Sequence, residues 1–215
     1  MRASLSLRSL IILALFAGIS AASAQTPGSK SAAPATAIFA GGCFWCVEEA
    51  FEKVPGVISA VSGYTGGSVP NPSYELVSSH KTGHAESVRV TFDPAKVSYS
   101  QLVDWFWHNI DPTQTNGQFC DHGSPYRTAI FYATDEQKQI AEQSKKTLEA
   151  SGVLKAPIVT EITPAGPFYE AEDYHQDYYK KNPHRYSFYK HGCGRAQRLE
   201  QIWGKPTAPP GGATH

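Results

Sequence analysis

A pair of glycines followed at once by a cysteine, in AIFAGGCFWCVEEAFEKVPG, sets the strongest constraint on how this chain can fold. The apolar run before it, residues 37–40, is typical of a buried strand, and the glycines predict a tight turn at its end. From Cys43 onward the apolar residues recur with helical spacing until Pro55 and Gly56 stop the pattern. The sequence therefore predicts a strand, a glycine turn and a helix, with Cys43 at the start of the helix.

Strand and helix patterns alternate through the rest of the chain. Strand-like runs cover residues 57–64, 85–92, 128–133 and 157–163. Helical patterns cover residues 100–110, with Ser98 or Ser100 as the N-cap, and 135–150. Residues 111–127 read as a long loop, and the aromatic, polar run after residue 163 shows no regular period. This alternation favours an α/β (α+β) two-layer sandwich with a ferredoxin-like split β-α-β core and an irregular aromatic C-terminal segment.

The first 24 residues have the composition of a secretory signal peptide. Arg2 and Arg8 precede an apolar run, and small residues end it at Ala24, where we expect cleavage. The apolar run of roughly ten residues is shorter than the ~20 that a membrane-spanning helix needs. We expect a flexible leader at residues 25–36, one folded domain at 37–205 and a disordered tail at 206–215. We also expect a periplasmic or secreted mature protein with no stable membrane association.

The charged residues argue against nucleic acid or anionic lipid as a partner. The chain has 19 basic and 19 acidic residues, for a formal charge of zero, and no block of basic residues. We therefore expect its partners to be small molecules or other proteins.

Four cysteines, at positions 43, 46, 120 and 193, need a reason to be present in an exported protein, where thiols readily become disulfides. A helix N-terminus stabilises a thiolate, so Cys43 is the candidate nucleophile. Cys46 lies one turn on, where a small distortion would join the two sulfurs. Such a pair suits a thiol that is oxidised and then resolved by its neighbour. A zinc site completed by Cys120 and His122, and a purely structural disulfide framework, are the alternatives.

Several phrases of the sequence resemble the A-type peptide methionine sulfoxide reductases. They are GCFWC with EEAFEKVPGV, then SGYTGG, PSYELVSSHKTGHAESVRVTFDP and QFCDHGSPYRTAIFY. The phrases occur in order and cover nearly the whole folded region. The resemblance implies reduction of the S-epimer of methionine sulfoxide, free or in peptides and proteins. It also implies an α/β sandwich with no metal or organic cofactor.

The resemblance gives roles to four residues that match the family's motifs. The family's nucleophile matches Cys43, its acid matches Glu86, and its two hydroxyl donors match Tyr74 and Tyr126. Charge that develops on the sulfoxide oxygen needs such a proton donor and such hydrogen bonds. From the residues alone, Glu86 lies on an alternating strand, where burial would raise its pKa and keep it protonated. An ordinary exposed strand position is the alternative.

Three further residues match parts of the family's substrate site. Phe44 and Trp45 match the walls of an apolar pocket for the substrate methyl group, and Asp121 matches an acid that supports the hydrogen-bonded site. Core packing is the alternative for the two aromatic residues, and a turn cap is the alternative for Asp121. We assign no catalytic step to His84, His122 or His175, because structural imidazoles are common.

After oxygen transfer, Cys43 would be a sulfenic acid that a second thiol converts to a disulfide, which an external dithiol must reduce. Cys46 is nearest and is our first choice for this resolving thiol. Cys193 is the rival, because relatives often place a resolving thiol in that region and a common family pattern has glycine at the position of Cys46. Cys120 is expected to be structural. Export would make the reductant a thioredoxin-like protein outside the cytoplasm.

Two other functions remain open from the sequence. A helix-opening CxxC would also suit a thioredoxin-like disulfide exchanger, which has no need of Glu86 or the two tyrosines. A non-catalytic secreted module held by disulfides would have no free thiol.

Overall fold

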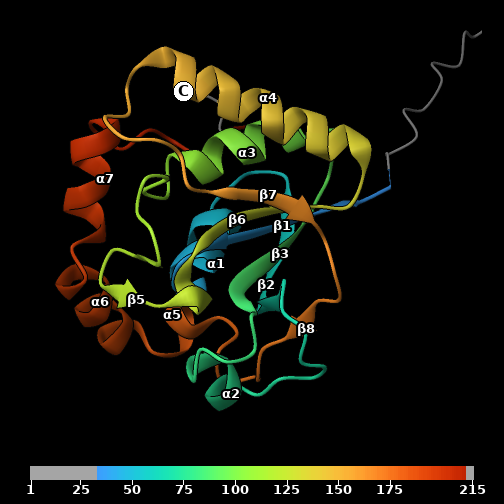
Figure 1. Cartoon of the computed structure of the whole chain (residues 1–215), viewed down its shortest axis with the longest axis vertical. Helices are drawn as coiled ribbons and strands as arrows, with labels where there is room; N and C mark the ends of the chain where they lie inside the picture. The colour runs from blue at the N-terminus through green and yellow to red at the C-terminus, as the bar shows by residue number, and fades with distance from the viewer. Residues whose placement is uncertain (1–32, 212–215) are drawn as a thin grey trace, which may run out of the picture. The chain divides into compact units, whose positions relative to one another are not determined.

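A mixed six-stranded sheet, in the order β7-β6-β1-β3-β2-β8, lies at the centre of the computed structural model (Figure 1). The structure describes residues 33–211, so the predicted signal peptide, most of the predicted leader and the last four residues lie outside it. The strands of this sheet are β1 (Ala35–Gly41), β2 (Val57–Thr65), β3 (Ala85–Phe92), β6 (Thr128–Tyr132), β7 (Glu161–Pro164) and β8 (Tyr169–Glu170). Because β1 begins at Ala35, the last two residues of the predicted leader belong to the sheet.

The elements outside the central sheet fall into three groups along the chain. Those that follow the central strands are α1 (Phe44–Glu52), α3 (Tyr99–Trp107) and α4 (Asp135–Ser151). Shorter elements of the connecting loops are α2 (Tyr74–Ser78), the 3₁₀ turn η1 (Ser124–Tyr126) and the two-stranded ribbon of β4 (Gly117–Gln118) and β5 (Asp121–His122). The C-terminal group is α5 (Tyr178–Lys181), α6 (Pro183–Gly192) and α7 (Arg195–Trp203).

The central elements confirm the predicted ferredoxin-like core. In chain order they are β1, α1, β2, β3, α3 and β6, which is the β-α-β-β-α-β arrangement. β3 lies between β1 and β2 and runs antiparallel to both, so it splits a parallel β-α-β unit. β6 pairs antiparallel with the other side of β1, and β7 then joins β6 in parallel through the crossover helix α4.

Helices α1 and α3 share one face of the sheet, where their aromatic side chains meet β1. Phe39 of β1 stacks on Phe51 of α1 and on Phe106 of α3, with ring centroids 4.8 and 5.1 Å apart. Burying a side chain of this size contributes ~1.5–3 kcal/mol. The indole N–H of Trp105 in α3 also donates to the carbonyl of Ala50 in α1, at 3.0 Å. These contacts fix α1, and with it the position of Cys43.

The turn between β1 and α1 requires glycine at position 42. Gly42 has a φ of +82°, and a Cβ there would lie 2.5 Å from the Cβ of Gln118. Gln118 cannot easily move, because it is fully buried and its side-chain carbonyl accepts the backbone N–H of Asp111. The tight passage from strand to helix that the glycine pair predicts is therefore confirmed.

The prediction of an irregular aromatic C-terminal segment is wrong for residues 178–192, where α5 and α6 form, and α7 follows directly. α6 begins with Pro183, a residue favoured in a first helical turn because its missing N–H is not needed there. Its aromatic residues lie on opposite faces of the helix, since Tyr186 is 5% exposed and Phe188 is 84% exposed, so they form no single apolar stripe. Hydrogen bonds from Tyr186 and Lys190 to Glu49 of α1 hold this helix in place. The last predicted strand is also shorter than expected, because β7 starts at Glu161.

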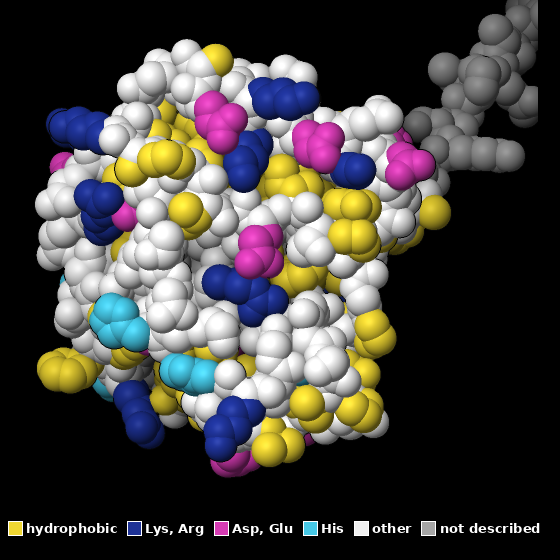
Figure 2. All heavy atoms as spheres, in the orientation of Figure 1, with side chains coloured by type: hydrophobic (Ala, Val, Ile, Leu, Met, Phe, Trp, Pro, Cys, Tyr) yellow, Lys and Arg dark blue, Asp and Glu magenta, His cyan; other side chains and the backbone are white. Residues whose placement is uncertain are grey.

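The surface and the helices give two further facts about the described part of the chain. Figure 2 shows acidic and basic side chains interspersed over the face drawn there, so neither sign forms a continuous patch on that face. None of the helices between residues 33 and 211 has the length and apolar character needed to span a bilayer.

Candidate active site

The two cysteines of the CxxC motif lie side by side at the start of α1. Cys43 is the N-cap residue and Cys46 lies in the first turn, with only 6% and 4% of each residue exposed. Both thiols are free, and a hydrogen bond joins them. Tyr178 of α5 and Tyr186 of α6 are buried in the same cluster. The C-terminal helices therefore cover a pair of sulfurs that α1 presents at the end of the sheet.

The pKa of Cys43 shifts in the opposite direction to the one that its place at a helix N-terminus predicts. Burial, followed by the neighbouring Cys46 and the carboxyl of Glu86, raises the pKa of Cys43 well above its ordinary value. The hydrogen bond from Cys43 lowers the pKa of Cys46 to about 6, with help from the positive charges of Arg195 and Lys190. Burial thus opposes a negative charge on Cys43, whereas the nearby positive charges favour one on Cys46. Desolvation outweighs the helix N-terminus at Cys43.

A cavity of about 210 Å³ opens beside Cys46, on the side of α3 and α7. Its lining includes Trp105, Lys190, Arg195 and Trp203. The guanidinium of Arg195 is fixed by donating to the carbonyls of Gly41 and Asn109, at 2.8 and 3.0 Å. The stabilising charge near Cys46 is thus held in place by the backbone.

Glu86 lies on β3 and is 3% exposed, so the burial predicted for it is confirmed. Its carboxylate oxygen accepts the backbone N–H of Phe44, at 3.0 Å, next to Cys43 in the chain. Burial raises the pKa of Glu86 to about 8, and negative charge at Asp121 and Cys46 adds to this effect, whereas the N–H of Phe44 opposes it. A carboxyl that stays protonated near neutral pH is a proton donor.

Tyr74 and Tyr126 come from separate loops and meet beside this carboxyl. Tyr74 opens α2 and Tyr126 ends the turn η1. Burial raises the pKa of both hydroxyls, and the negative charge of Glu86 is the next cause for each. Each of the two hydroxyls lies close enough to affect the pKa of the other. The structure therefore brings together the four residues that the resemblance assigns to catalysis.

Phe44, Trp45 and His175 form an aromatic wall next to Cys43. The ring of Trp45 stacks on that of Tyr178 with centroids 3.7 Å apart, and its indole N–H donates to Nδ1 of His175, at 3.1 Å. The ring of His175 lies 5.0 Å from that of Phe44 and 4.5 Å from that of Tyr74. Since Nδ1 accepts a hydrogen bond, Nε2 carries the ring proton, and this buried atom has no partner in the structure. The wall is apolar apart from that one donor.

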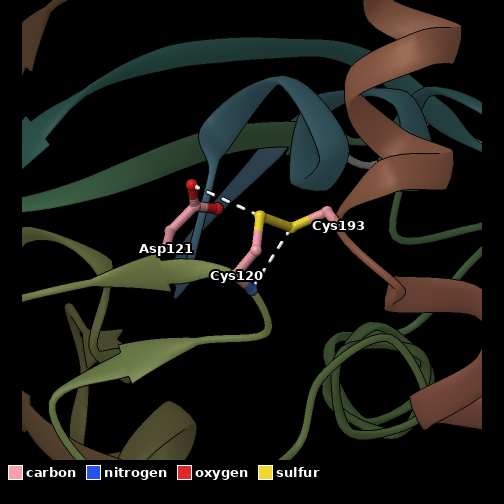
Figure 3. A group of neighbouring side chains, drawn as sticks. All are labelled: Cys120, Asp121 and Cys193. Atoms are coloured by element: carbon pink, nitrogen blue, oxygen red, sulfur yellow. Dashed lines mark hydrogen bonds between the residues drawn. A yellow bond between two sulfur atoms is a disulfide. The ribbon is translucent and has the colours of Figure 1, made fainter.

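Asp121 lies on β5, between the active site and a disulfide. Its carboxylate accepts the hydroxyl of Tyr189 of α6, at 2.5 Å, and burial raises its pKa. The neighbouring residue Cys120 is joined to Cys193 in a disulfide, as Figure 3 shows. The sequence did not predict this pairing. It occupies the sulfur of Cys120, which the zinc alternative requires, and it means that Cys193 could act as a resolving thiol only after the disulfide had opened.

Sequence reasoning missed most of the residues that cover the site from the C-terminal side. Tyr178, Tyr186, Tyr189 and Arg195 all contact or flank the two sulfurs, and all lie in helices that the pattern did not reveal. The density of tyrosine between residues 174 and 189 was the available signal, since so many hydroxyls in one short run need buried partners.

Comparison with known proteins agrees with this geometry. Residues 35–207 match the family model described as peptide methionine sulfoxide reductase. The chain is 54% identical to the peptide methionine sulfoxide reductase MsrA of Bacillus licheniformis, over 79% of this chain and 93% of that protein. It is 58% identical to that of Ligilactobacillus salivarius, over 78% of this chain and 97% of that protein.

Two solved structures resemble the fold. Mxr1 from Saccharomyces cerevisiae in reduced form aligns with a TM-score of 0.66 and 31% identity, covering 70% of this chain and 87% of that chain. Methionine sulfoxide reductase A of Corynebacterium diphtheriae aligns with a TM-score of 0.63 and 38% identity, covering 73% of this chain and 77% of that chain. The family match includes the whole sheet and every residue placed around Cys43 above, so the chain belongs to the A-type peptide methionine sulfoxide reductases.

Proposed function

We propose that the protein reduces methionine S-sulfoxide, free or in peptides and proteins, with Cys43 as the attacking thiol. One observation carries the proposal: a buried cysteine lies beside the protonated carboxyl of Glu86 and two tyrosine hydroxyls, against an aromatic wall. An apolar wall suits the methyl group of the substrate, and the acid and hydroxyls suit its oxygen. Family membership supports the same reaction.

The first steps use the shared proton of the two thiols. The hydrogen bond from Cys43 to Cys46 lets the proton of Cys43 pass to the Cys46 thiolate, which leaves a thiolate at Cys43 without changing the charge of the pair. That sulfur attacks the sulfur of the sulfoxide, while Glu86 gives its proton to the sulfoxide oxygen and Tyr74 and Tyr126 donate hydrogen bonds to it. Oxygen transfer leaves a sulfenic acid on Cys43 and releases methionine.

The next step is the formation of a disulfide. The thiol of Cys46 condenses with the sulfenic acid, so that one S–S bond forms and one water leaves. Direct contact between Cys43 and Cys46 supports Cys46 as the resolving thiol. The bond between Cys120 and Cys193 supports the same order, because no free thiol exists at Cys193 in this state. Cys193 can take part only after an external dithiol has reduced its bond to Cys120, when its thiolate can attack the new disulfide and release Cys46 or Cys43 as a thiol.

The reductant and the location are also proposals. A thioredoxin-like dithiol protein would reduce the disulfide by thiol exchange and return two thiols to the enzyme. The signal-peptide pattern of residues 1–24 supports a periplasmic or secreted enzyme, and hence a donor in the same compartment. N-terminal sequencing of the protein from cell fractions tests this: a cytosolic protein that retains Met1 would contradict it.

Turnover of the two separated epimers of N-acetylmethionine sulfoxide tests the function. We expect the S-epimer to be reduced at least a hundredfold faster than the R-epimer, since the wall and the acid lie on fixed sides of Cys43. Cys43→Ser should abolish the reaction, whereas Cys46→Ser should form about one methionine per protein and then stop. Equal rates on both epimers, or faster reduction of insulin disulfides than of any sulfoxide, would favour a disulfide exchanger instead.

A further inference from the structure

A hydroxyl that the proposed mechanism does not use lies between Asp121 and Cys43. Tyr189 donates its hydroxyl proton to the carboxylate of Asp121, at 2.5 Å, and the same hydroxyl reaches the sulfur of Cys43. A tyrosine has one proton to donate, so it can serve only one of these two acceptors at a time. Burial and the neighbouring negative charges raise the pKa of Tyr189, so the hydroxyl stays protonated.

The disulfide holds both ends of this hydrogen bond. Cys120 directly precedes Asp121, and Cys193 follows Tyr189 by one helical turn, with its N–H donating to the Tyr189 carbonyl at 2.9 Å. The backbone N–H of Cys120 donates to the sulfur of Cys193 at 3.2 Å, and the carboxylate of Asp121 lies against the sulfur of Cys120 (Figure 3). The ribbon that carries Asp121 and the helix that carries Tyr189 are therefore fixed to one another beside Cys43.

We propose that Tyr189 is a third active-site hydroxyl, which turns from Asp121 to donate its hydrogen bond to the Cys43 thiolate, and that the Cys120–Cys193 disulfide positions it. The proposal rests on the proposed function, in which Cys43 must lose its proton before attack. As that proton moves to Cys46, negative charge appears on Cys43, and the Tyr189 hydroxyl turns toward it while keeping its own proton. Tyr74 and Tyr126 then remain free for the sulfoxide oxygen.

Other titratable groups also face Cys43 and must be held constant in a test. They include Cys46 of α1, Glu86 of β3, Tyr74 of α2 and Tyr126 of η1. The C-terminal helices add Tyr178 and Tyr186, with Arg195 and Lys190 beside Cys46. Asp121 itself faces the guanidinium of Arg195 and the ring of His122. A change of Tyr189 to phenylalanine keeps the ring, which lies edge-on to Trp45 at 5.9 Å, and removes only the hydroxyl.

The test measures the pH dependence of Cys43 alkylation by iodoacetamide. A Cys46→Ser chain with the Cys120–Cys193 disulfide intact is the reference, because Cys43 is then the only free thiol. In this reference, Tyr189→Phe should raise the midpoint pH of alkylation by about one unit and slow alkylation at pH 7 about tenfold, as expected for losing a hydrogen bond to a charged group. An unchanged midpoint would overturn the proposal.

Two further variants separate positioning from general damage. Tyr179→Phe is the matched control, because Tyr179 also donates to a carboxylate, that of Glu52, but does not reach Cys43; its midpoint should equal the reference. Replacing both Cys120 and Cys193 by serine should raise the midpoint in the same direction as Tyr189→Phe, and combining the changes should give no further rise. Additive effects would refute the role given to the disulfide.

The alkylation test is independent of the proposed function. One methionine formed per Cys46→Ser chain measures the function, whereas the alkylation midpoint needs no sulfoxide. If no methionine forms but Tyr189→Phe still shifts the alkylation midpoint, the proposed reaction is wrong and the role of Tyr189 at Cys43 stands.

Discussion

Replacing Glu86 by glutamine tests the buried acid most directly. The side chain is 3% exposed and its pKa is raised from 4.5 to about 8, mainly by burial. The folded protein therefore binds more protons than the unfolded chain between these two pH values, and its stability falls as the pH rises through that window. The stabilising contribution of the neutral carboxyl is complete below pH 4.5 and is lost by about pH 8.

The size of the effect follows from the same two values. At about 1.4 kcal/mol per pH unit, a gap from 4.5 to about 8 corresponds to a loss of about 5 kcal/mol in the free energy of unfolding. Glutamine has nearly the same shape but does not ionise, so Glu86→Gln removes this loss. Between pH 5 and pH 9 the free energy of unfolding should fall less in the variant than in the parent chain, and the difference should approach this loss of about 5 kcal/mol.

Urea unfolding of both chains at a series of pH values measures this difference, because titrating groups that do not interact with Glu86 are common to both chains and cancel. The same variant should lower kcat/KM for the sulfoxide by about 10²–10⁴, the usual contribution of a positioned acid. In the parent chain, kcat/KM should fall as the pH rises through about 8, where Glu86 loses its proton. Parallel stability curves for the two chains would refute the buried neutral carboxyl.

Three further changes test other parts of the structure. Gly42→Ala places a Cβ 2.5 Å from that of Gln118 at a positive φ, so it should lower the free energy of unfolding by about 2–4 kcal/mol, measured by urea unfolding. Ser98→Ala removes the capping box at the start of α3 and should cost about 1 kcal/mol in the same assay. Arg195→Gln removes the charge near Cys46 and should raise the pKa of that thiol above about 6, seen as slower alkylation of Cys46 at pH 7 by tandem mass spectrometry. If a variant leaves its measured quantity unchanged, the contact that the variant removes or disturbs does not have the role given to it here.

The sequence predicts the core of the fold because its patterns are local. The strand at residues 85–92 and the helix capped by Ser98 depend on period and capping alone, and the structure has them nearly as predicted. Helices α5 and α6 depend on contacts with α1, and α7 depends on hydrogen bonds to residues 109–111, and no short window of sequence contains these contacts. This is why Tyr186 and Tyr189 escaped notice although they lie against the two sulfurs.

The site divides in the same way. The motif spacing identifies the neighbourhood of Cys43, Glu86, Tyr74 and Tyr126, and the structure brings these residues together. A helix N-terminus is visible in a sequence and predicts a lowered pKa at Cys43, whereas the burial that raises this pKa depends on the whole fold. The Cys120–Cys193 pairing, across 73 residues, is likewise a property of the fold and not of any motif.

The sheet order has a consequence for how the molecule assembles. β1 pairs with β3 and β6 and not with its sequence neighbour β2, so Phe39 finds its partners at Val88 and Ile130. Pairings between distant segments close large loops, and chains rich in them fold slowly. The strand β1, which leads into Cys43, is synthesised before β3 and β6, but its pairing on both edges is complete only after β6 has been synthesised. Cys43 therefore enters its final surroundings late, when most of the chain has already been made.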